Sequence, residues 1–95
     1  MRIVYPAIFT PCEKKSGYTV VVPDLPGCVT EGSSLADAIY MASDAACGWI
    51  LGELEDGNSY PAPSDRKDVE VPEGSFVNLI LVEIDFTKGA AYGQS

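Results

Sequence analysis

Residues 18–38, which read YTVVVPDLPGCVTEGSSLADA, decide the fold of this chain. Residues 18–22 predict a strand, with Tyr18, Val20 and Val22 on one face and Thr19 and Val21 on the other. Residues 23–27 hold two prolines and a glycine and predict a turn, because they cannot continue a ladder of backbone hydrogen bonds. Residues 28–31 then resume as a short strand. The stretch therefore predicts two neighbouring antiparallel strands joined by a rigid turn.

The end of the same stretch predicts the start of a helix. Ser34 is a good N-cap, and Asp37 follows three residues later in a capping-box arrangement. Asp56-Gly57-Asn58 is a stop signal, so we expect the helix to end near Glu55. Apolar residues at helical spacing form the stripe that we expect to pack on a sheet: Leu35, Ala38, Ile39, Ala42, Ala46, Trp49 and Ile50.

A second apolar arc lies roughly opposite this stripe on the helix. Gly48 and Gly52, which weaken a helix relative to alanine, lie between the two. Two interpretations are open: a long loop folds over this arc, or the arc is a protein–protein contact, such as an oligomer interface. The residues of the second arc are Tyr40, Cys47, Leu51 and Leu54.

Outward from residues 18–38, segments 3–10 and 75–86 predict two further strands. Pro6 has no N–H to donate, so the first strand is expected to lie at an edge or to be bulged there. The last strand is apolar on both faces early on, so we expect it to be interior for at least half its length. The order is then β-β-β-α-β, an α+β fold in which one helix covers one face of a mainly antiparallel sheet.

The remaining segments complete a single domain. Residues 58–74 form a proline-containing loop, either functional or partly mobile, in which Val69 and Val71 are expected to make a short edge segment. We expect residues 1–86 to be the domain and residues 87–95 a short flexible tail. Apolar residues on the uncovered sheet face predict a homodimer, a larger assembly or another partner.

Composition narrows the functional classes. The formal net charge of −8 suits a basic protein partner and repels the phosphates of nucleic acids. The sequence contains no histidine, which removes the Ser-His and Cys-His nucleophile systems and the commonest metal ligand. Three unevenly spaced cysteines fit neither a disulfide framework nor a zinc site, so we expect free thiols, no metal and no cofactor. The first residues show no signal-peptide core, so we expect a cytoplasmic protein.

Several of these segments together resemble the HicB antitoxin family. The resemblance is carried by YPAIF at 5–9, GYTVVVPDLPGCVTEG at 17–32, SLADA at 34–38, and Gly57 with YPAPS at 60–64. It covers about residues 3–86. It implies a partial ribonuclease-H-like fold and a HicA-like toxin as partner: a small basic protein with a double-stranded-RNA-binding-like fold that cleaves mRNA with a histidine. The resemblance also implies that this chain neutralises the toxin as a type II antitoxin.

The chain departs from the family pattern after Phe86. The resemblance implies a C-terminal DNA-binding segment, of the helix-turn-helix or ribbon-helix-helix kind. Residues 87–95 are too few for either module and contain one basic residue. We therefore expect no DNA binding by this chain alone.

The turn at residues 23–27 is the expected toxin contact. Leu25 is expected to be exposed at the turn tip, where an apolar residue on a rigid support loses little entropy on binding. Asp24 either accepts backbone N–H groups and holds the turn, or presents its carboxylate to a toxin Lys or Arg. Glu31 is either a solvated strand end or a further contact.

Two other functions are weighed against the antitoxin. A ribonuclease-H-like fold invites a two-metal nuclease, which needs several carboxylates converging on two ions. Residues 3–10 contain no acidic residue, so we expect no catalytic residues and no enzyme. The other alternative is a solitary, homo-oligomeric binding module without a toxin partner.

Overall fold

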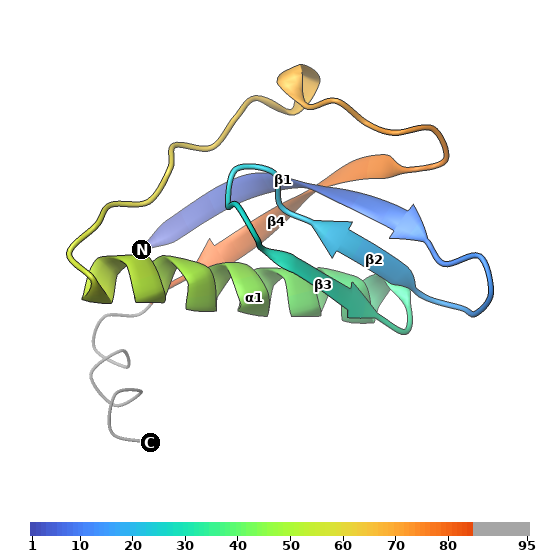
Figure 1. Ribbon diagram of the computed structural model, residues 1–95, viewed down its shortest axis with the longest axis horizontal. Coiled ribbons are helices and arrows are strands. Elements are labelled where there is room, and N and C mark those ends of the chain that lie inside the picture. Colours follow the sequence, from blue (N-terminus) through green and yellow to red (C-terminus); the bar gives the residue numbers. More distant parts are fainter. Residues whose placement is uncertain (85–95) are drawn as a thin grey trace.

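The computed structural model describes residues 1–84 and shows a four-stranded antiparallel sheet with one α-helix across one face (Figure 1). The elements are β1 (Arg2–Pro11), β2 (Tyr18–Val21), β3 (Val29–Gly32), α1 (Leu35–Glu55), the short 3-10 helix η1 (Arg66–Asp68) and β4 (Phe76–Glu83). The strand order β3-β2-β1-β4 places the last strand along the first. The predicted α+β class and β-β-β-α-β order are confirmed. Within residues 1–84, no helix has the length and apolar character needed to cross a membrane.

Helix α1 begins where the capping residues predicted. The Ser34 hydroxyl accepts the Asp37 N–H at 3.1 Å, and the Asp37 carboxylate accepts the Ser33 N–H at 2.9 Å. These bonds satisfy N–H groups that the first helical turn cannot pair internally. At the other end, Gly57 adopts a positive φ of 81°, which ends the helix at little steric cost.

The core lies between α1 and one face of the sheet. Three small residues and one large one on α1 are fully buried: Ala38, Ala42, Ala46 and Ile50. Opposite them, alternate residues of β1 point toward the helix and are buried, among them Tyr5 and Phe9. The alanines let the helix axis approach the sheet closely, and the aromatic side chains of the strand fill the space between.

The positions of β1 and β4 in the sheet correct two expectations. β1 is an interior strand and β4 is an edge strand, the reverse of what Pro6 and the apolar β4 sequence predicted. The Met1 amino group donates to the Ile84 carbonyl at 2.7 Å, and the Ile84 N–H donates to the Met1 carbonyl at 2.8 Å. From this pair onward, hydrogen-bonded and non-hydrogen-bonded residue pairs alternate along the β1–β4 ladder. Pro6 opposite Leu79 then falls on a non-hydrogen-bonded pair, and the pairing with β2 begins only at Ile8. The missing N–H of Pro6 therefore leaves no gap in either ladder.

Residues 58–75, which we call the strap, run back from the end of α1 to the start of β4 (Figure 1). The expected edge segment at Val69 and Val71 is wrong, because neither residue pairs as a strand. The nearest regular structure is η1, just before them. The expected last strand is also shorter, Phe76–Glu83, and the part of it beyond Ile84, like the expected tail, lies outside the described residues.

Candidate protein-interaction site

Asp24 connects the β2–β3 turn to the strap. Its two carboxylate oxygens accept hydrogen bonds from the N–H and the hydroxyl of Ser64, at 2.8 and 2.5 Å. The turn itself is closed by backbone bonds, such as that from the Leu25 N–H to the Val22 carbonyl at 3.0 Å. Asp24 thus holds a distant segment, and its own turn does not depend on it. The Asp24 carboxylate acts in this structure as a latch for the strap.

Two further hydrogen bonds fasten the same region. The Tyr5 hydroxyl donates to the Pro61 carbonyl at 2.6 Å, and the Trp49 indole N–H donates to the Pro26 carbonyl at 2.9 Å. Burial raises the pKa of the Tyr5 hydroxyl, and the charges of Asp24 and Tyr60 raise it further. Tyr5 therefore stays protonated at neutral pH and remains a donor to the strap.

Loss of the Asp24 latch is expected to lower stability without unfolding the domain. Asp24→Ala removes two charge-assisted hydrogen bonds, so we expect the free energy of unfolding to fall by about 1–2 kcal/mol. Urea denaturation measures this loss, and amide exchange at Ser64 should become faster. Glu70→Ala removes the same charge from an exposed strap residue and serves as the control. Equal stabilities of the two variants would contradict the latch.

The structure contradicts the expected exposure of Leu25. Its side chain is 0% exposed and belongs to the main core cluster. The turn folds inward because Leu25 is held by backbone bonds to Val22 and Cys28 and points under the sheet rather than away from it. Leu25 is therefore unavailable as a surface anchor in this conformation.

Glu31 and Asp24 are not brought together as one acidic pair. Glu31 lies on β3 opposite Thr19 and is exposed, with its carboxylate 3.9 Å from the ammonium group of Lys15. Asp24 bonds to the strap instead. Within residues 1–84, acidic and cysteine side chains nowhere gather in a group of three or more that could hold a metal ion.

The four residues of the second apolar arc of α1 differ in their burial. Cys47, Leu51 and Leu54 are partly buried against the core, and the Cys47 thiol donates to the Glu83 carbonyl at a sulfur–oxygen distance of 3.7 Å. Burial raises the pKa of the Cys47 thiol, and the charge of Asp44 raises it further, so the thiolate is disfavoured. Tyr40 alone of the four is exposed, at 67%.

Tyr40 belongs to the outer face of α1, which we define by its exposed positions Tyr40, Asp44, Gly48, Gly52 and Glu55. This face has a large aromatic ring, two carboxylates and two glycines without side chains. No Lys or Arg occurs between Lys15 and Arg66, so the whole helix is acidic. Such a face offers an aromatic anchor and a negative potential to a basic partner. The absence of basic residues over this length was the sequence signal that could have indicated it.

The uncovered face of the sheet is apolar, as expected. Its exposed large side chains come from all four strands: Val4, Val21, Val29, Leu79 and Leu81. The strap covers only part of this face, including the region of Val77, which is nearly buried. The molecule therefore presents two candidate surfaces: the acidic outer face of α1 and the apolar region that includes β4.

Comparison with known proteins gives a family match over most of the chain. The model of the HicB_like antitoxin of bacterial toxin-antitoxin systems matches residues 5–92. Antitoxin HicB 2 of Photorhabdus laumondii subsp. laumondii is 32% identical over 80 residues, which are 82% of this chain and 56% of that protein. The chain spans about half the length of the curated relatives that it matches.

Two solved structures share the fold. A toxin–antitoxin complex from Streptococcus pneumoniae contains a chain that superposes with a TM-score of 0.79 at 21% identity, covering 87% of this chain and 70% of that one. A chain of the HicA3 and HicB3 toxin–antitoxin complex superposes with a TM-score of 0.65 at 27% identity, covering 87% of this chain and 99% of that one. These similarities extend across the sheet and the helix.

Proposed function

Because this chain belongs to the family of HicB-like antitoxins, we propose that it is a type II antitoxin that binds and neutralises a HicA-like, mRNA-cleaving toxin. The family match and the antitoxin relative support the role. The similarity to a chain of the HicA3 and HicB3 complex supports the kind of partner.

The outer face of α1 is the surface that carries this proposal. The decisive observation is Tyr40, 67% exposed on a helix that has four acidic residues and no basic one. An exposed tyrosine is a frequent anchor of protein interfaces because it buries a large area with few rotatable bonds. Gly48 and Gly52 leave the neighbouring backbone open to close approach by a partner.

The mechanism is electrostatic and steric. The carboxylates of α1 attract a basic toxin and occupy the positive surface to which RNA phosphates would bind. Glu31 is two residues from Val29 on β3 and is exposed on the uncovered face of the sheet, apart from α1, whereas Asp24 acts through the position of the strap. No step of this mechanism breaks a bond, so the chain acts as a binding protein and not as an enzyme.

The proposed antitoxin role also indicates where the protein acts and whether it binds DNA. An antitoxin that protects mRNA acts in the cytoplasm. The net charge of −8 makes DNA an unfavourable ligand for this domain alone, because DNA binding requires neutralisation of phosphates by Lys and Arg. Self-association of the chain is also part of the proposed function.

Removing the Tyr40 ring is expected to weaken toxin binding strongly. A buried aromatic anchor contributes about 2 kcal/mol or more, so Tyr40→Ala should raise the Kd about 30-fold or more. Asp44→Lys, one turn further along the same face, should weaken binding and slow association, with an effect that fades at high salt. Calorimetry with the purified HicA-like toxin measures both, and an RNA cleavage assay measures the lost protection.

The control for this experiment is Glu70→Lys, which makes the same charge change as Asp44→Lys on the strap. It should leave toxin affinity within about threefold of the original value. Circular dichroism should show that all variants are folded, because Tyr40 and Asp44 are exposed. If both α1 variants bind the toxin as tightly as the unchanged chain, the toxin does not bind this face.

A further inference from the structure

β4 is a long edge strand whose outer backbone groups follow from the β1–β4 register. Met1 and Ile84 form a hydrogen-bonded pair, so even-numbered residues of β4 direct their N–H and C=O groups toward β1. Odd-numbered residues direct theirs outward. Two side-chain contacts agree with this assignment: the Val77 carbonyl accepts from Arg66 at 2.9 Å, and the Glu83 carbonyl accepts from Cys47.

Between these two ends, the outer edge of β4 is open. The outward N–H and C=O groups of Leu79 and Leu81 have no hydrogen-bond partner within residues 1–84. Their side chains are 47% and 45% exposed on the uncovered face. An edge of this kind is a template for pairing with another strand, and proteins normally protect it with Lys, Pro or a bulge. β4 contains neither Lys nor Pro, and its one charged residue, Glu83, is its last.

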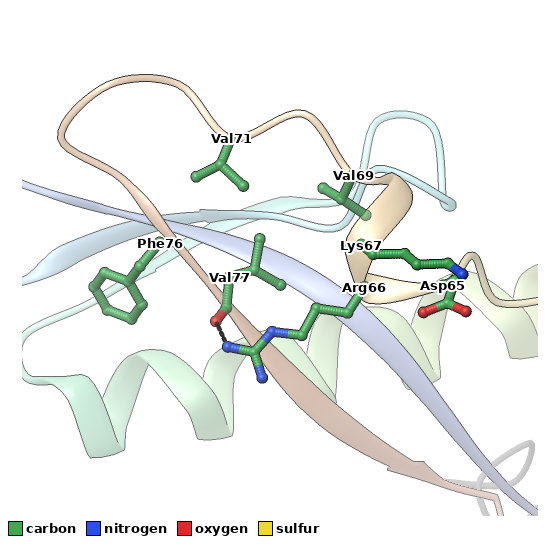
Figure 2. A pocket seen from close by; sticks show the side chains of 7 residues that line it. All are labelled: Asp65, Arg66, Lys67, Val69, Val71, Phe76 and Val77. Atoms are coloured by element: carbon green, nitrogen blue, oxygen red, sulfur yellow. Dashed lines mark hydrogen bonds between the residues drawn. The ribbon is translucent and has the colours of Figure 1, made fainter.

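The strap places a basic groove at the start of this edge. The groove has a volume of about 660 Å³ and lies between the strap and the first residues of β4 (Figure 2). Arg66 reaches across it to the Val77 carbonyl. In an otherwise acidic chain, the groove combines two cations with apolar side chains, and its lining is Asp65, Arg66, Lys67, Val69, Val71, Phe76 and Val77.

We propose that β4 pairs antiparallel with β4 of a second copy of this chain, about a two-fold axis at Ile80. In this register Leu79 of each copy is opposite Leu81 of the other, and their outward backbone groups form four hydrogen bonds. The four leucine side chains meet on the uncovered face, which becomes continuous across an eight-stranded sheet. Because the axis is two-fold, the interface is self-complementary.

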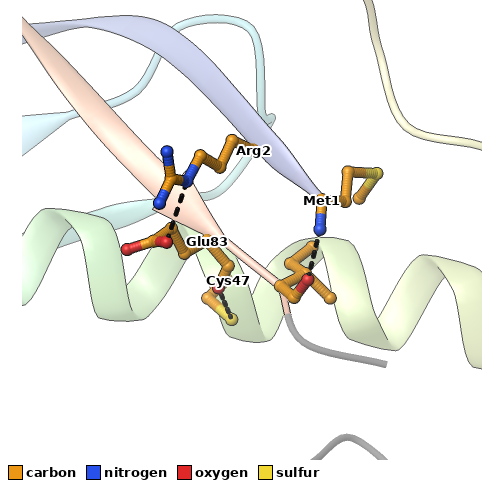
Figure 3. A network of polar contacts seen from close by, with 5 residues as sticks. Met1, Arg2, Cys47 and Glu83 are labelled. Atoms are coloured by element: carbon orange, nitrogen blue, oxygen red, sulfur yellow. Dashed lines mark hydrogen bonds and ion pairs between the residues drawn. The ribbon is translucent and has the colours of Figure 1, made fainter. Parts of the chain in front are cut away.

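Charge complementarity selects a second copy as the occupant. The same register places Glu83 of one copy opposite Val77 of the other, beside Arg66, and the two-fold axis repeats this ion pair. Glu83 is 60% exposed and pairs with Arg2 at 3.0 Å within its own chain, so it can be shared between the two cations (Figure 3). A basic toxin would meet repulsion from Arg66 and Lys67 at this groove, whereas an acidic chain meets attraction.

The outer face of α1 and the β4 edge are separate surfaces. The first is formed by helix positions directed away from the sheet, and the second is the free edge of the sheet itself. Pairing through β4 therefore leaves the face around Tyr40 free. The inference does not depend on the proposed toxin, because it concerns only copies of this chain.

Sedimentation velocity of the purified chain tests the pairing. We expect a dimer at micromolar concentration, and Leu79→Lys should raise the dimer dissociation constant about 100-fold by placing a charge in the centre of the interface. Val29→Lys, on the other edge strand, is the matched control and should leave the dimer unchanged. A monomer at 100 µM, about ten times the concentration at which we expect the dimer to form, would overturn the proposal.

A charge exchange tests the register. Arg66→Glu and Glu83→Arg should each weaken the dimer about fivefold or more, and the double variant should recover part of the lost affinity, because it reverses the pair between copies but leaves Arg2 unchanged. Amide exchange at Leu79 and Leu81 should slow as protein concentration rises. If Leu79→Lys leaves the dimer intact but abolishes toxin binding, the edge belongs to the toxin and the proposal fails. Unchanged amide exchange at both leucines in a dimer would also overturn it.

Discussion

Leu25→Asp is expected to unfold a large fraction of the molecules. The Leu25 side chain is fully buried, so the change removes its apolar contacts and places a carboxylate in the core. Loss of a buried leucine alone costs about 2–5 kcal/mol, and the buried charge adds to this. A domain of this size is typically stable by about 5–10 kcal/mol. We therefore expect a fall of about 4 kcal/mol or more in the free energy of unfolding, measured by urea denaturation.

The matched control is Val29→Asp, four residues further along. Val29 is 57% exposed on β3, so the same type of change should alter stability by less than about 1 kcal/mol. A loss of toxin binding by Leu25→Asp would then reflect unfolding rather than a missing contact. If Leu25→Asp is as stable as Val29→Asp, the inward position of the turn is contradicted.

Gly32→Ala is expected to have the second largest effect. A Cβ at Gly32 would lie 2.5 Å from the Ala38 Cα and 2.8 Å from the Asp37 carbonyl carbon, both in the backbone of the first turn of α1. Backbone atoms cannot rotate away as a side chain can, so the helix start must shift relative to β3. Overpacking of this kind costs about 3 kcal/mol. The measurement is the shift of the urea midpoint together with the near-ultraviolet spectrum of Trp49.

Gly48→Ala makes the same change on the outer face of α1 and should have the opposite sign. Apart from the adjacent residues and the nearby backbone of α1 itself, no atom of the described structure lies within 4 Å of the added Cβ. Alanine is the better helix former, so the variant should gain up to about 1 kcal/mol. Gly32 lies on β3 against the backbone of α1, whereas Gly48 lies within α1 on its open face, so the two changes measure a packing requirement and helix propensity separately. Stabilisation by Gly32→Ala would show that β3 and α1 do not approach as closely as the structure has them.

Local patterns in the sequence were sufficient for the elements of the fold. The Ser34 and Asp37 cap, the alanine stripe of α1 and the turn after Val22 depend on neighbours within a few residues, and each was found where predicted. The resemblance to HicB antitoxins also came from contiguous segments. Secondary structure and family are therefore readable from this chain, because they rest on periodicity, capping and short-range motifs.

The positions of strands in the sheet were not readable in the same way. The apolar sequence of β4 is compatible with an interior position in the sheet and with an edge position. The proline in β1 is tolerated because the register places it opposite Leu79, in a pair that forms no hydrogen bonds. Register and strand order depend on pairing between residues far apart in the sequence. Only the tertiary structure therefore revealed that β1 is interior and that β4 is the open edge.

The candidate site likewise combines features that the sequence determined with features that depend on the tertiary structure. The sequence by itself determined the family, the acidic charge and the helix, whereas the exposure of Tyr40 came from the structure. The tertiary structure decided that Leu25 points into the core, that Asp24 holds the strap, and that Arg66 lies beside the start of β4. The physical reason is that the direction of a side chain at a turn depends on its tertiary partners, and the hydrogen bonds that hold this turn and the strap join residues 23 to 56 positions apart.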